Sequence, residues 1–390
     1  MALNFQQVFE RIRQIGLGAR ARQKSQDALR RHARSLLADW ADKPGELRDK
    51  LERAHQADPS LRCAIPLDER LDAYFPEPAS VPPATLLAAD GSQILPDRHA
   101  SVQYSLVNVG AIALQSGSGG TPEVFTDSTL LFGDELFTET GMLTEEAIEQ
   151  QRDIAERRKL LELAPDYPAP VLALTDGPVE LWGAKGAGED DYRRNLEIHK
   201  SILSQLESHG VTVAGYVDKP GADLVVRTLE IAQFSSDEEF KDIRKQHCLR
   251  GVTDRWLYSF LPGGHRSAVF GLQSGSRIHY TGDLALHFFY LNAGDAAHPW
   301  LVRVEIPKWV AADEASLALL HAALLEQCRI MGVKPYPYIL HRAHEIAVVK
   351  FEEKKQVEQM LELELRQAGS EVDTESNKQS AKNLQGRSRK

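Results

Sequence analysis

The feature that most constrains the fold of this chain is a short, fully apolar strand that directly follows a helix. Residues 169–177 read APVLALTDG, an unbroken apolar run typical of a central strand covered on both faces of its sheet. The preceding residues 144–163 have helical periodicity, with acidic side chains in the first turn that complement the helix dipole. A second helix near 190–208 and a second strand at 211–218 follow. This alternation of helices and strands predicts an α/β fold.

Strand and helix patterns continue on both sides of this core. Residues 85–90 and 101–117 are rich in apolar and β-branched side chains, and 250–310 is rich in strand-like runs as well. Helical periodicity returns at 314–332 and at 343–367. The expected architecture is a sheet flanked by helices.

The two ends of the chain differ in character from this core. Residues 4–56 have the spacing of two amphipathic helices, and a proline-rich stretch follows them. The last ~20 residues lack apolar periodicity, as disordered segments do. We therefore predict a helical segment at 1–60, a linker at 61–84, one α/β domain at 85–366 and a disordered tail at 367–390.

Composition is that of a folded protein of the cell interior. The 390 residues are 42% hydrophobic, which is enough for a full core. No apolar run reaches the ~18 residues of a membrane span, and the N-terminus has no secretory signal, so we expect a cytoplasmic protein without membrane contact. The three cysteines, Cys63, Cys248 and Cys328, lie far apart and indicate neither a zinc site nor disulfides.

The distribution of charge limits how the chain can meet nucleic acid. A net charge of −10 argues against binding by bulk electrostatics. Residues 1–40 nevertheless carry eight Lys or Arg against three acids, beside a run of apolar residues at helical spacing: Phe5, Val8, Phe9 and Ile12. This segment is either an ordinary solvated helix face or a surface that docks a partner.

Two of the predicted strands end in the same dipeptide. TLLAADGS at 85–92 and VLALTDGP at 171–178 both place Asp-Gly after an apolar run, at Asp90 and Asp176. Asp-Gly is a common signal for a hairpin turn, but neither copy is followed by a clean returning strand. The pair therefore favours two carboxylates held at the ends of adjacent strands.

Two carboxylates placed in this way resist joint ionisation unless a cation joins them. Oxygen ligands of this kind suit Mn²⁺ or Mg²⁺. The helix at 144–163 offers a third ligand; we choose Glu156, with Asp153 on the same face as the runner-up and Glu162 as a further candidate. Such clusters typically hydrolyse phosphodiesters with metal-activated water.

Two further stretches of the sequence resemble known functional motifs but do not match them. The histidines of HRAHE at 341–345 are three residues apart and do not fit the zinc motif HExxH. The glycine-rich run at 177–188 fails the spacing of a phosphate-binding P-loop, which argues against an ATP site. Tyr336, Arg342 and His344 remain as neighbouring donors of the kind that bind phosphate.

Three basic residues complete the set of candidates. Lys219, Arg227 and Arg266 each have the character of ordinary surface or packing charges when taken singly. As a group they could line a groove the width of a nucleic-acid strand, so we treat them as candidate substrate contacts.

Taken in order, these motifs resemble those of the NurA nuclease family. LLAADGS, the helix RDIAERRKLLEL before LALTDGP, VAGYVDKP, HRSAVF, RVEIP and YPYILHRAH span residues 86–350, about two thirds of the chain. Each motif is short, but their order and the ending YPxxLxxAH make the resemblance specific.

The resemblance implies a ribonuclease-H-like mixed sheet and a Mn²⁺-dependent DNA nuclease with 5′–3′ exonuclease and single-strand endonuclease activity. It also implies a homodimer that docks on a HerA-type hexameric ATPase in DNA end processing, for repair or defence. Asp90 and Asp176 match the two metal aspartates, and Glu156 matches the helix glutamate by its position about twenty residues upstream. Tyr336 and His344 match the C-terminal tyrosine and histidine. The N-terminal helices and the tail inherit nothing from the family.

Two alternatives stay open at the level of the sequence. A non-catalytic DNA clamp, or an adaptor subunit of the ATPase, would use the same fold without a metal, although the presence of all three carboxylates speaks against it. A phosphatase or nucleotide hydrolase would use the same carboxylates on a smaller substrate. A metal titration tests the first alternative, and a panel of nucleotides and oligonucleotides tests the second.

Overall fold

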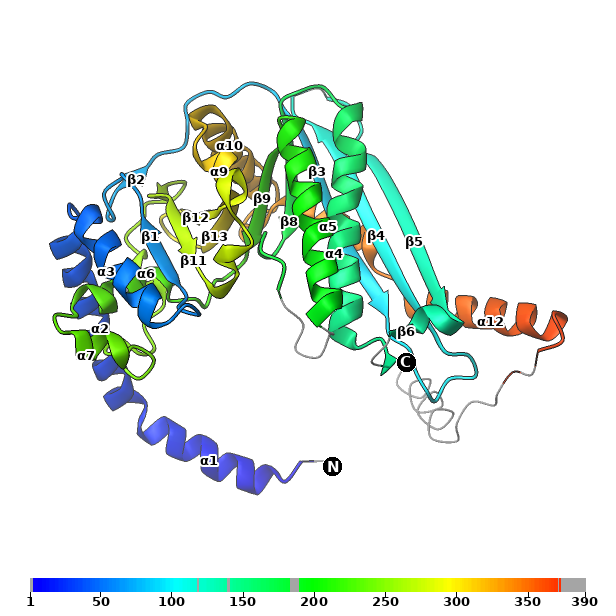
Figure 1. Cartoon of the computed structure of the whole chain (residues 1–390), viewed down its shortest axis with the longest axis horizontal. Coiled ribbons are helices and arrows are strands. Elements are labelled where there is room, and N and C mark those ends of the chain that lie inside the picture. The colour runs from blue at the N-terminus through cyan, green and yellow to red at the C-terminus, as the bar shows by residue number, and fades with distance from the viewer. Residues whose placement is uncertain (1–2, 118, 139–140, 183–188, 371, 373–390) are drawn as a thin grey trace. The chain divides into compact units, whose positions relative to one another are not determined.

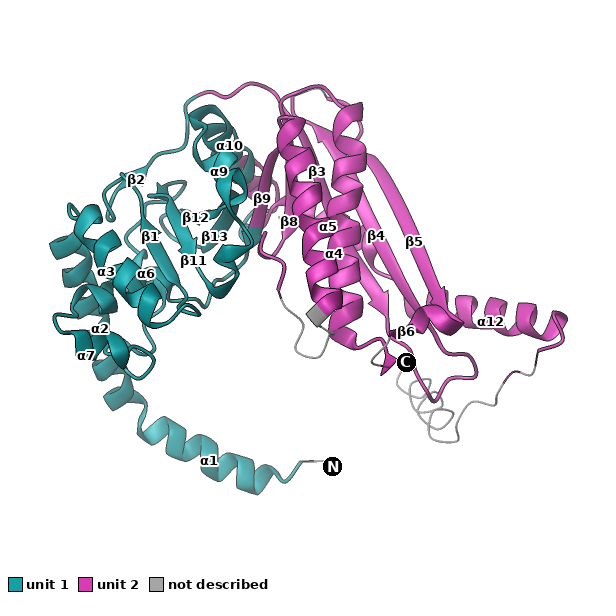
Figure 2. Ribbon diagram, viewed as in Figure 1, with its two compact units in different colours: residues 1–79, 216–325, 332–335 teal, residues 80–215, 326–331, 336–390 magenta. Residues whose placement is uncertain are grey.

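The computed structural model describes residues 3–117, 119–138, 141–182, 189–370 and 372 (Figure 1). The chain divides into two compact units (Figure 2). Unit 1 comprises residues 1–79, 216–325 and 332–335, and unit 2 comprises residues 80–215, 326–331 and 336–390. The expected α/β domain at 85–366 thus contributes to both units, and the N-terminal helices share unit 1 with residues 216–325.

Unit 1 begins with three helices where the sequence predicted two. They are α1 (Phe5–Leu17), α2 (Ala19–Trp40) and α3 (Pro44–Ala57). Pro44 is the first residue of α3, and because proline has no backbone N–H it suits a helix start but not a helix interior. This proline explains why the second predicted helix is divided.

The sheet of unit 1 is antiparallel. Its strands are β1 (Cys63–Pro66), β2 (Tyr74–Phe75), β10 (Arg266–Ser267), β11 (Phe270–Gln273), β12 (Leu286–Asn292) and β13 (Leu301–Pro307). The order is β1-β11-β12-β13, and β10 pairs with both β12 and β2. The linker predicted at 61–84 is therefore wrong in part. Cys63 and Ala64 are fully buried and pair with β11, because their apolar side chains gain more from the core than from solvent.

Five further helices begin in unit 1. They are α6 (Leu224–Ala232), α7 (Asp237–Lys241), α8 (Asp254–Leu257), α9 (Lys308–Ala311) and α10 (Glu314–Ile330). Asp254 accepts the backbone N–H of Val225 at 2.9 Å and of Val226 at 2.8 Å, and the hydroxyl of Tyr290 at 2.5 Å. Burial raises the pKa of Asp254 to about 6 in spite of these hydrogen bonds. This carboxyl group therefore anchors the start of α6.

Unit 2 contains a mixed sheet. Its strands are β3 (Thr85–Ile94), β4 (Tyr104–Gln115), β5 (Glu123–Phe132), β8 (Val171–Asp176) and β9 (Thr212–Val217), in the order β9-β8-β3-β4-β5. β3 pairs in parallel with β8 and antiparallel with β4, which pairs antiparallel with β5. β6 (Phe137–Thr138) and β7 (Gly141–Met142) pair antiparallel as a separate two-stranded sheet.

Four helices belong to unit 2. α4 (Glu145–Leu163) and α5 (Glu189–Ser208) pack against each other and lie over the sheet (Figure 1). α11 (Tyr338–Ala347) packs on β3 and β4, and α12 (Phe351–Gln367) follows it. The single helix predicted at 343–367 is wrong, because the chain becomes extended at Val348 and separates α11 from α12.

The main expectations for the fold class are confirmed: a mixed sheet, flanking helices and an N-terminal helical segment. The predicted disordered tail lies almost wholly outside the described residues. Within the part of the chain that the structure describes, no helix has both the length and the apolar character needed to cross a membrane. Cys63, Cys248 and Cys328 form no disulfide bond with one another.

Candidate active site

The two aspartates of the Asp-Gly pairs occupy matched positions on adjacent parallel strands. β3 and β8 pair in register from Thr85 opposite Val171 to Ala89 opposite Thr175. Asp90 and Asp176 are the next residues on their strands. Adjacent strands lie about 4.8 Å apart, and side chains at matched positions project to the same face. Sheet geometry therefore places the two residues side by side on neighbouring strands.

Asp90 does not end its strand, however. β3 continues to Ile94, and Asp90 pairs with Gly110 of β4. Only β8 ends at this level, at Asp176. The expectation of two strand ends is thus wrong for the first copy, because β4 pairs with β3 for four more residues, Gly91 to Ile94, beyond the level at which β8 ends. Asp90 lies where β3 loses its neighbour on one side, and the Asp-Gly pair there is not a turn.

Two glycines let helices approach opposite faces of the sheet at this position. A Cβ on Gly110, opposite Asp90, would lie 2.4 Å from the backbone nitrogen of Ala347 in α11. A Cβ on Gly91, the next residue of β3, would lie 2.8 Å from Oε1 of Glu156 in α4. Successive residues of a strand point to opposite faces. α11 therefore covers the face from which Asp90 projects. Glu156 approaches β3 from α4, near enough to Asp90 for their like charges to interact.

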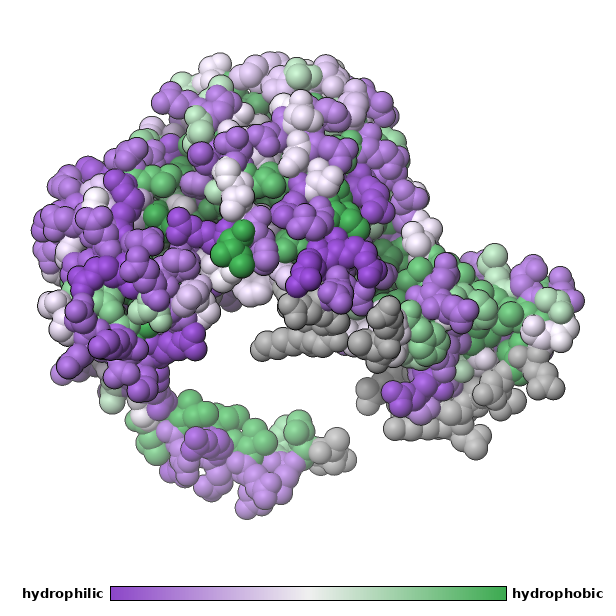
Figure 3. All heavy atoms as spheres, viewed as in Figure 1, coloured by the Kyte–Doolittle hydropathy of each residue, from purple (hydrophilic) through white to green (hydrophobic). Residues whose placement is uncertain are grey.

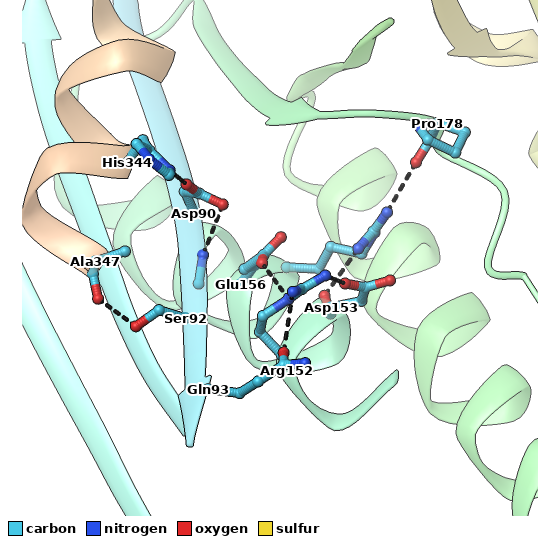
Figure 4. Close-up of polar contacts among 11 residues, drawn as sticks. Asp90, Ser92, Gln93, Arg152, Asp153, Glu156, Pro178, His344 and Ala347 are labelled. Carbon is cyan, nitrogen blue, oxygen red and sulfur yellow. Dashed lines mark hydrogen bonds and ion pairs between the residues drawn. The ribbon is translucent and has the colours of Figure 1, made fainter. Parts of the chain in front are cut away.

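His344 contacts the first aspartate directly (Figure 4). Its Nδ1 lies 2.6 Å from Oδ2 of Asp90. The side chain of His344 is 63% exposed and that of Asp90 is 17% exposed, so the pair is open to solvent. Tyr336 is half-buried and lies two residues before the start of α11. A histidine in this position can orient the carboxylate or pass a proton to a leaving oxygen.

Glu156 is buried beside other acids. Burial is the main reason why its pKa is raised to about 8, and the like charges of Asp153 and Asp90 add to the effect. The guanidinium groups of Arg157 and Arg152 oppose it. A carboxyl group that is held close to like charges takes up a proton unless a cation stabilises its charged form. Asp153, the runner-up in the sequence analysis, is more exposed than Glu156.

Two arginines near the carboxylates were not singled out from the sequence. Arg152 lies one turn before Glu156 on α4, with its Nε 3.4 Å from Oε1 of Glu156. Arg157 is buried and donates to the backbone oxygens of Asp153 at 2.8 Å and Pro178 at 2.9 Å. The spacing of Arg152 and Glu156, four residues apart on one helix face, was the signal that could have predicted their ion pair.

The residues that follow Asp176 are held from two sides. Arg157 of α4 binds the backbone oxygen of Pro178, while a Cβ on Gly215 in β9 would lie 2.5 Å from the backbone oxygen of Gly177. Gly177 has φ +86°, in the left-handed region that glycine adopts at little cost. The turn after Asp176 is therefore fixed, and the exposed Asp176 side chain projects from a defined backbone.

The chemistry of the donor set fits a hard divalent cation. Its candidate ligands are carboxylates, and oxygen ligands are those that Mn²⁺ and Mg²⁺ prefer. Four acids and two arginines here carry a formal charge of −2 when all are ionised: Asp90, Asp153, Glu156, Asp176, Arg152 and Arg157. Among the described residues, no group of three or more His, Cys, Asp or Glu side chains is arranged to hold a metal. The carboxylates would therefore have to reorient to bind one.

The three basic candidates all lie in unit 1, and they differ in accessibility. Lys219 is exposed, whereas Arg227 is buried, ion-paired with Glu230 at 2.5 Å. The guanidinium group of Arg227 thus has a structural role and is unavailable to a DNA strand, contrary to the expectation from the sequence. Arg266 is mostly buried, with its guanidinium 4.0 Å from the centre of the Phe75 ring.

The fold and the carboxylate cluster define an α/β protein with a candidate metal site on its mixed sheet. The sequence model of the NurA domain matches residues 84–349, a range that contains Asp90, Glu156, Asp176, Tyr336 and His344. This match covers more than half of the chain, and the chain belongs to the NurA family.

Several solved structures are similar to this one. The NurA nuclease from Sulfolobus solfataricus is 14% identical, with 76% of this chain and 88% of that chain covered and a TM-score of 0.48. The catalytic domain of human Endonuclease V is 15% identical, with 72% and 84% covered and a TM-score of 0.32. RNase H1 from Halobacterium salinarum NRC-1 is 21% identical, with 31% and 78% covered and a TM-score of 0.19. Comparison with curated protein sequences found no match. The family assignment rests on the sequence match alone.

Proposed function

We propose that this member of the NurA family is a divalent-metal-dependent DNA nuclease. The observation that carries the proposal is the matched position of Asp90 and Asp176 on β3 and β8, with Glu156 packed against the same stretch of β3. The family match supports hydrolysis of a phosphodiester bond. Carboxylates grouped in this way are the usual support for that reaction.

In the proposed mechanism, Asp90, Glu156 and Asp176 hold Mn²⁺ or Mg²⁺. Such an ion, when bound, supplies an activated water and stabilises charge on the phosphate. His344, in contact with Oδ2 of Asp90, keeps that carboxylate oriented and assists the leaving oxygen with a proton. Tyr336, just before α11, holds the substrate strand with its hydroxyl group. Lys219, which is exposed, is proposed as a further contact to the DNA backbone, whereas Arg266 is held by Glu69 and Phe75 and is not available for this role.

The finer assignment follows the resemblance to the family. We propose 5′–3′ exonuclease and single-strand endonuclease activity by a cytoplasmic homodimer that works with a HerA-type hexameric ATPase in DNA end processing, for repair or defence. The net charge of −10 supports a role for such a partner, since a translocase that feeds DNA to the nuclease reduces its need for strong DNA binding of its own.

The surface proposed to meet the partner is the apolar face of α1. This helix has no buried residue, and its side chains Phe5, Phe9 and Ile12 are 61%, 67% and 58% exposed. Figure 3 shows these apolar side chains gathered along one side of the helix. A large exposed apolar face is typical of a surface that another protein covers. The partner is either the ATPase or the second subunit.

A second candidate function is a non-catalytic clamp or adaptor subunit of the ATPase complex. It is favoured by one observation: the described residues contain no group of three acidic, histidine or cysteine side chains that is arranged to hold a metal. This function predicts binding of DNA or of the ATPase without metal binding at Asp90 and Asp176.

A nuclease assay with end-labelled oligonucleotides tests the proposal. With Mn²⁺, the wild-type protein should degrade single-stranded DNA, and Asp90→Ala should lose this activity by at least about a hundredfold. Asp39→Ala, which removes an exposed aspartate of α2, is the matched control and should leave the rate unchanged. An Asp90→Ala protein as active as the wild type would refute the assignment. Nucleotides included as substrates identify a phosphatase or nucleotide hydrolase.

A further inference from the structure

Arg152 lies among the candidate ligands and has no role in the function proposed above. Its Nη1 donates to Oε1 of Gln93 at 3.0 Å, and its Nη2 donates to Oδ1 of Asp153 at 3.0 Å (Figure 4). Its Nε lies 3.4 Å from Oε1 of Glu156. The guanidinium group is thus held in one plane by side chains from β3 and α4.

The aliphatic part of Arg152 is clamped against the strand. A Cβ on Gly91 would lie 2.4 Å from Cγ and 2.9 Å from Cδ of Arg152. The side chain therefore crosses β3 one residue after Asp90 and directs its charged end along the part of the strand that β8 no longer accompanies. The position of the guanidinium group is fixed by packing as well as by hydrogen bonds.

One donor of this group is unsatisfied. Nε of Arg152 is buried and has no hydrogen-bond partner, since its approach to Glu156 is close enough for an ion pair but not aligned for a hydrogen bond. A buried charged donor without a partner costs free energy and requires an explanation. A negatively charged oxygen of a substrate would satisfy this donor.

Arg152 also competes with any cation for Glu156. A guanidinium group stays charged at every physiological pH, and its planar donors match two oxygens of a phosphate. When Glu156 turns to a divalent ion, Arg152 loses its partner there while Gln93 and Asp153 still hold its plane. The freed Nε then faces the same space as the ion, where a DNA phosphate would have to lie.

We propose that Arg152 is a substrate-binding residue that contacts a DNA phosphate next to the bond that is cut. The inference rests on the nuclease function proposed above. Removal of the guanidinium group should weaken the use of DNA without weakening the binding of Mn²⁺. A residue that only positions Glu156 would have the opposite signature.

Arg152→Gln and Arg158→Gln form a matched pair for the test. Both remove one positive charge from α4, but Arg158 is exposed. Cleavage of oligonucleotides with Mn²⁺ should show a kcat/KM that is lower by about ten- to a hundredfold in Arg152→Gln, the size expected for a lost charged hydrogen bond. Mn²⁺ affinity, measured by electron paramagnetic resonance without DNA, should be unchanged or higher. Arg158→Gln should match the wild type in both measurements.

A neutral methylphosphonate, placed at successive linkages of the oligonucleotide, identifies the contacted phosphate. At one linkage beside the cut, it should lower kcat/KM of the wild type by the same factor as the mutation, and it should have no further effect on Arg152→Gln. Equal methylphosphonate penalties in both proteins, or a loss of Mn²⁺ affinity in Arg152→Gln, would overturn the proposal.

A second variant covers the case in which Arg152→Gln does not fold. Arg152→Lys keeps the packed stem and the charge but loses the planar donors, so it should retain part of the kcat/KM and the sensitivity to the methylphosphonate. If Arg152→Lys were as active as the control variant Arg158→Gln, the planar donors of the guanidinium group would not be needed, and a planar contact with the phosphate would be contradicted. A wild-type protein that does not cleave DNA overturns the nuclease function itself, whereas an active wild type with an equally active Arg152→Gln overturns only the role of Arg152.

Discussion

Replacement of Gly91 by alanine tests whether the missing side chain at this position allows the side chains of α4 to contact β3. The backbone of Gly91 lies outside the left-handed region, so an alanine there meets no conformational strain. The new methyl group would, however, lie 2.8 Å from Oε1 of Glu156 and 2.4 Å from Cγ of Arg152. We expect the side chains of α4 to be pushed away from β3.

The size of both effects follows from this geometry. Ordinary contacts of a Cβ begin at 3.4 Å, so the two side chains must move by up to about 1 Å. Overpacking of this kind costs about 1–3 kcal/mol, partly offset by the ~0.4–1 kcal/mol that a Gly-to-Ala change gains through the unfolded state. A displacement of about 1 Å in a catalytic group can cost about a hundredfold in rate. Activity should therefore fall far more than stability.

Urea unfolding and Mn²⁺-dependent cleavage of DNA, measured on the same preparations, check this prediction. Gly45→Ala is the control, because Gly45 lies in α3 and a Cβ added there would meet no atom within 4 Å. This variant should keep full activity and gain about 0.5–1 kcal/mol in unfolding free energy. If Gly91→Ala cleaves DNA within twofold of the wild-type rate, the contact between Gly91 and Glu156 has no part in catalysis.

Three other predictions concern stability. Gly110→Ala should cost more unfolding free energy than Gly91→Ala in the same urea assay, since its Cβ would meet backbone atoms of α11 that cannot turn aside; equal costs would refute this. The folded pKa of Asp254, about 6, exceeds its unfolded value of 3.8. Its contribution to the unfolding free energy is therefore complete below pH 3.8 and should decline by up to ~3 kcal/mol as the pH rises through 6. Asp254→Asn should lack this pH-dependent component in unfolding curves at several pH values, and a pH profile identical to that of the wild type would contradict the prediction. Deletion of residues 1–17 should change the unfolding free energy by less than ~1 kcal/mol, because α1 buries no side chain, yet abolish co-purification with the ATPase or dimer formation; retained association would exclude α1 as the docking surface.

Local patterns were sufficient to predict the centre of unit 2. The helix at α4 and the strand at β8 have strong periodicity and clear boundaries, and the repeated Asp-Gly pair placed Asp90 and Asp176 on neighbouring strands. β5 was missed because nearly all of its side chains are exposed, which leaves no alternation to detect. β1 was hidden in a proline-rich stretch and is stabilised by pairing with β11, a strand about two hundred residues away.

The acid that completes the site could not be decided from the sequence. Asp153 and Glu156 lie three residues apart and share a helix face, so periodicity treats them alike. Both acids form an ion pair with Arg152, but the side chain of Glu156 is 7% exposed and lies against β3 at Gly91, whereas that of Asp153 is 33% exposed. Arg152 and Arg157 were missed for a different reason: they contact Gln93 and Pro178, which lie 59 and 21 residues away in the sequence.

A titration with Mn²⁺ decides whether Asp90 and Glu156 hold a metal ion. The full chain and its variants are compared by electron paramagnetic resonance, which measures the bound metal without any reaction. We expect the wild type to bind Mn²⁺, Asp90→Asn and Glu156→Gln to lose most of this affinity, and Asp153→Asn to keep it. Wild-type affinity in Glu156→Gln together with its loss in Asp153→Asn would contradict the site described here.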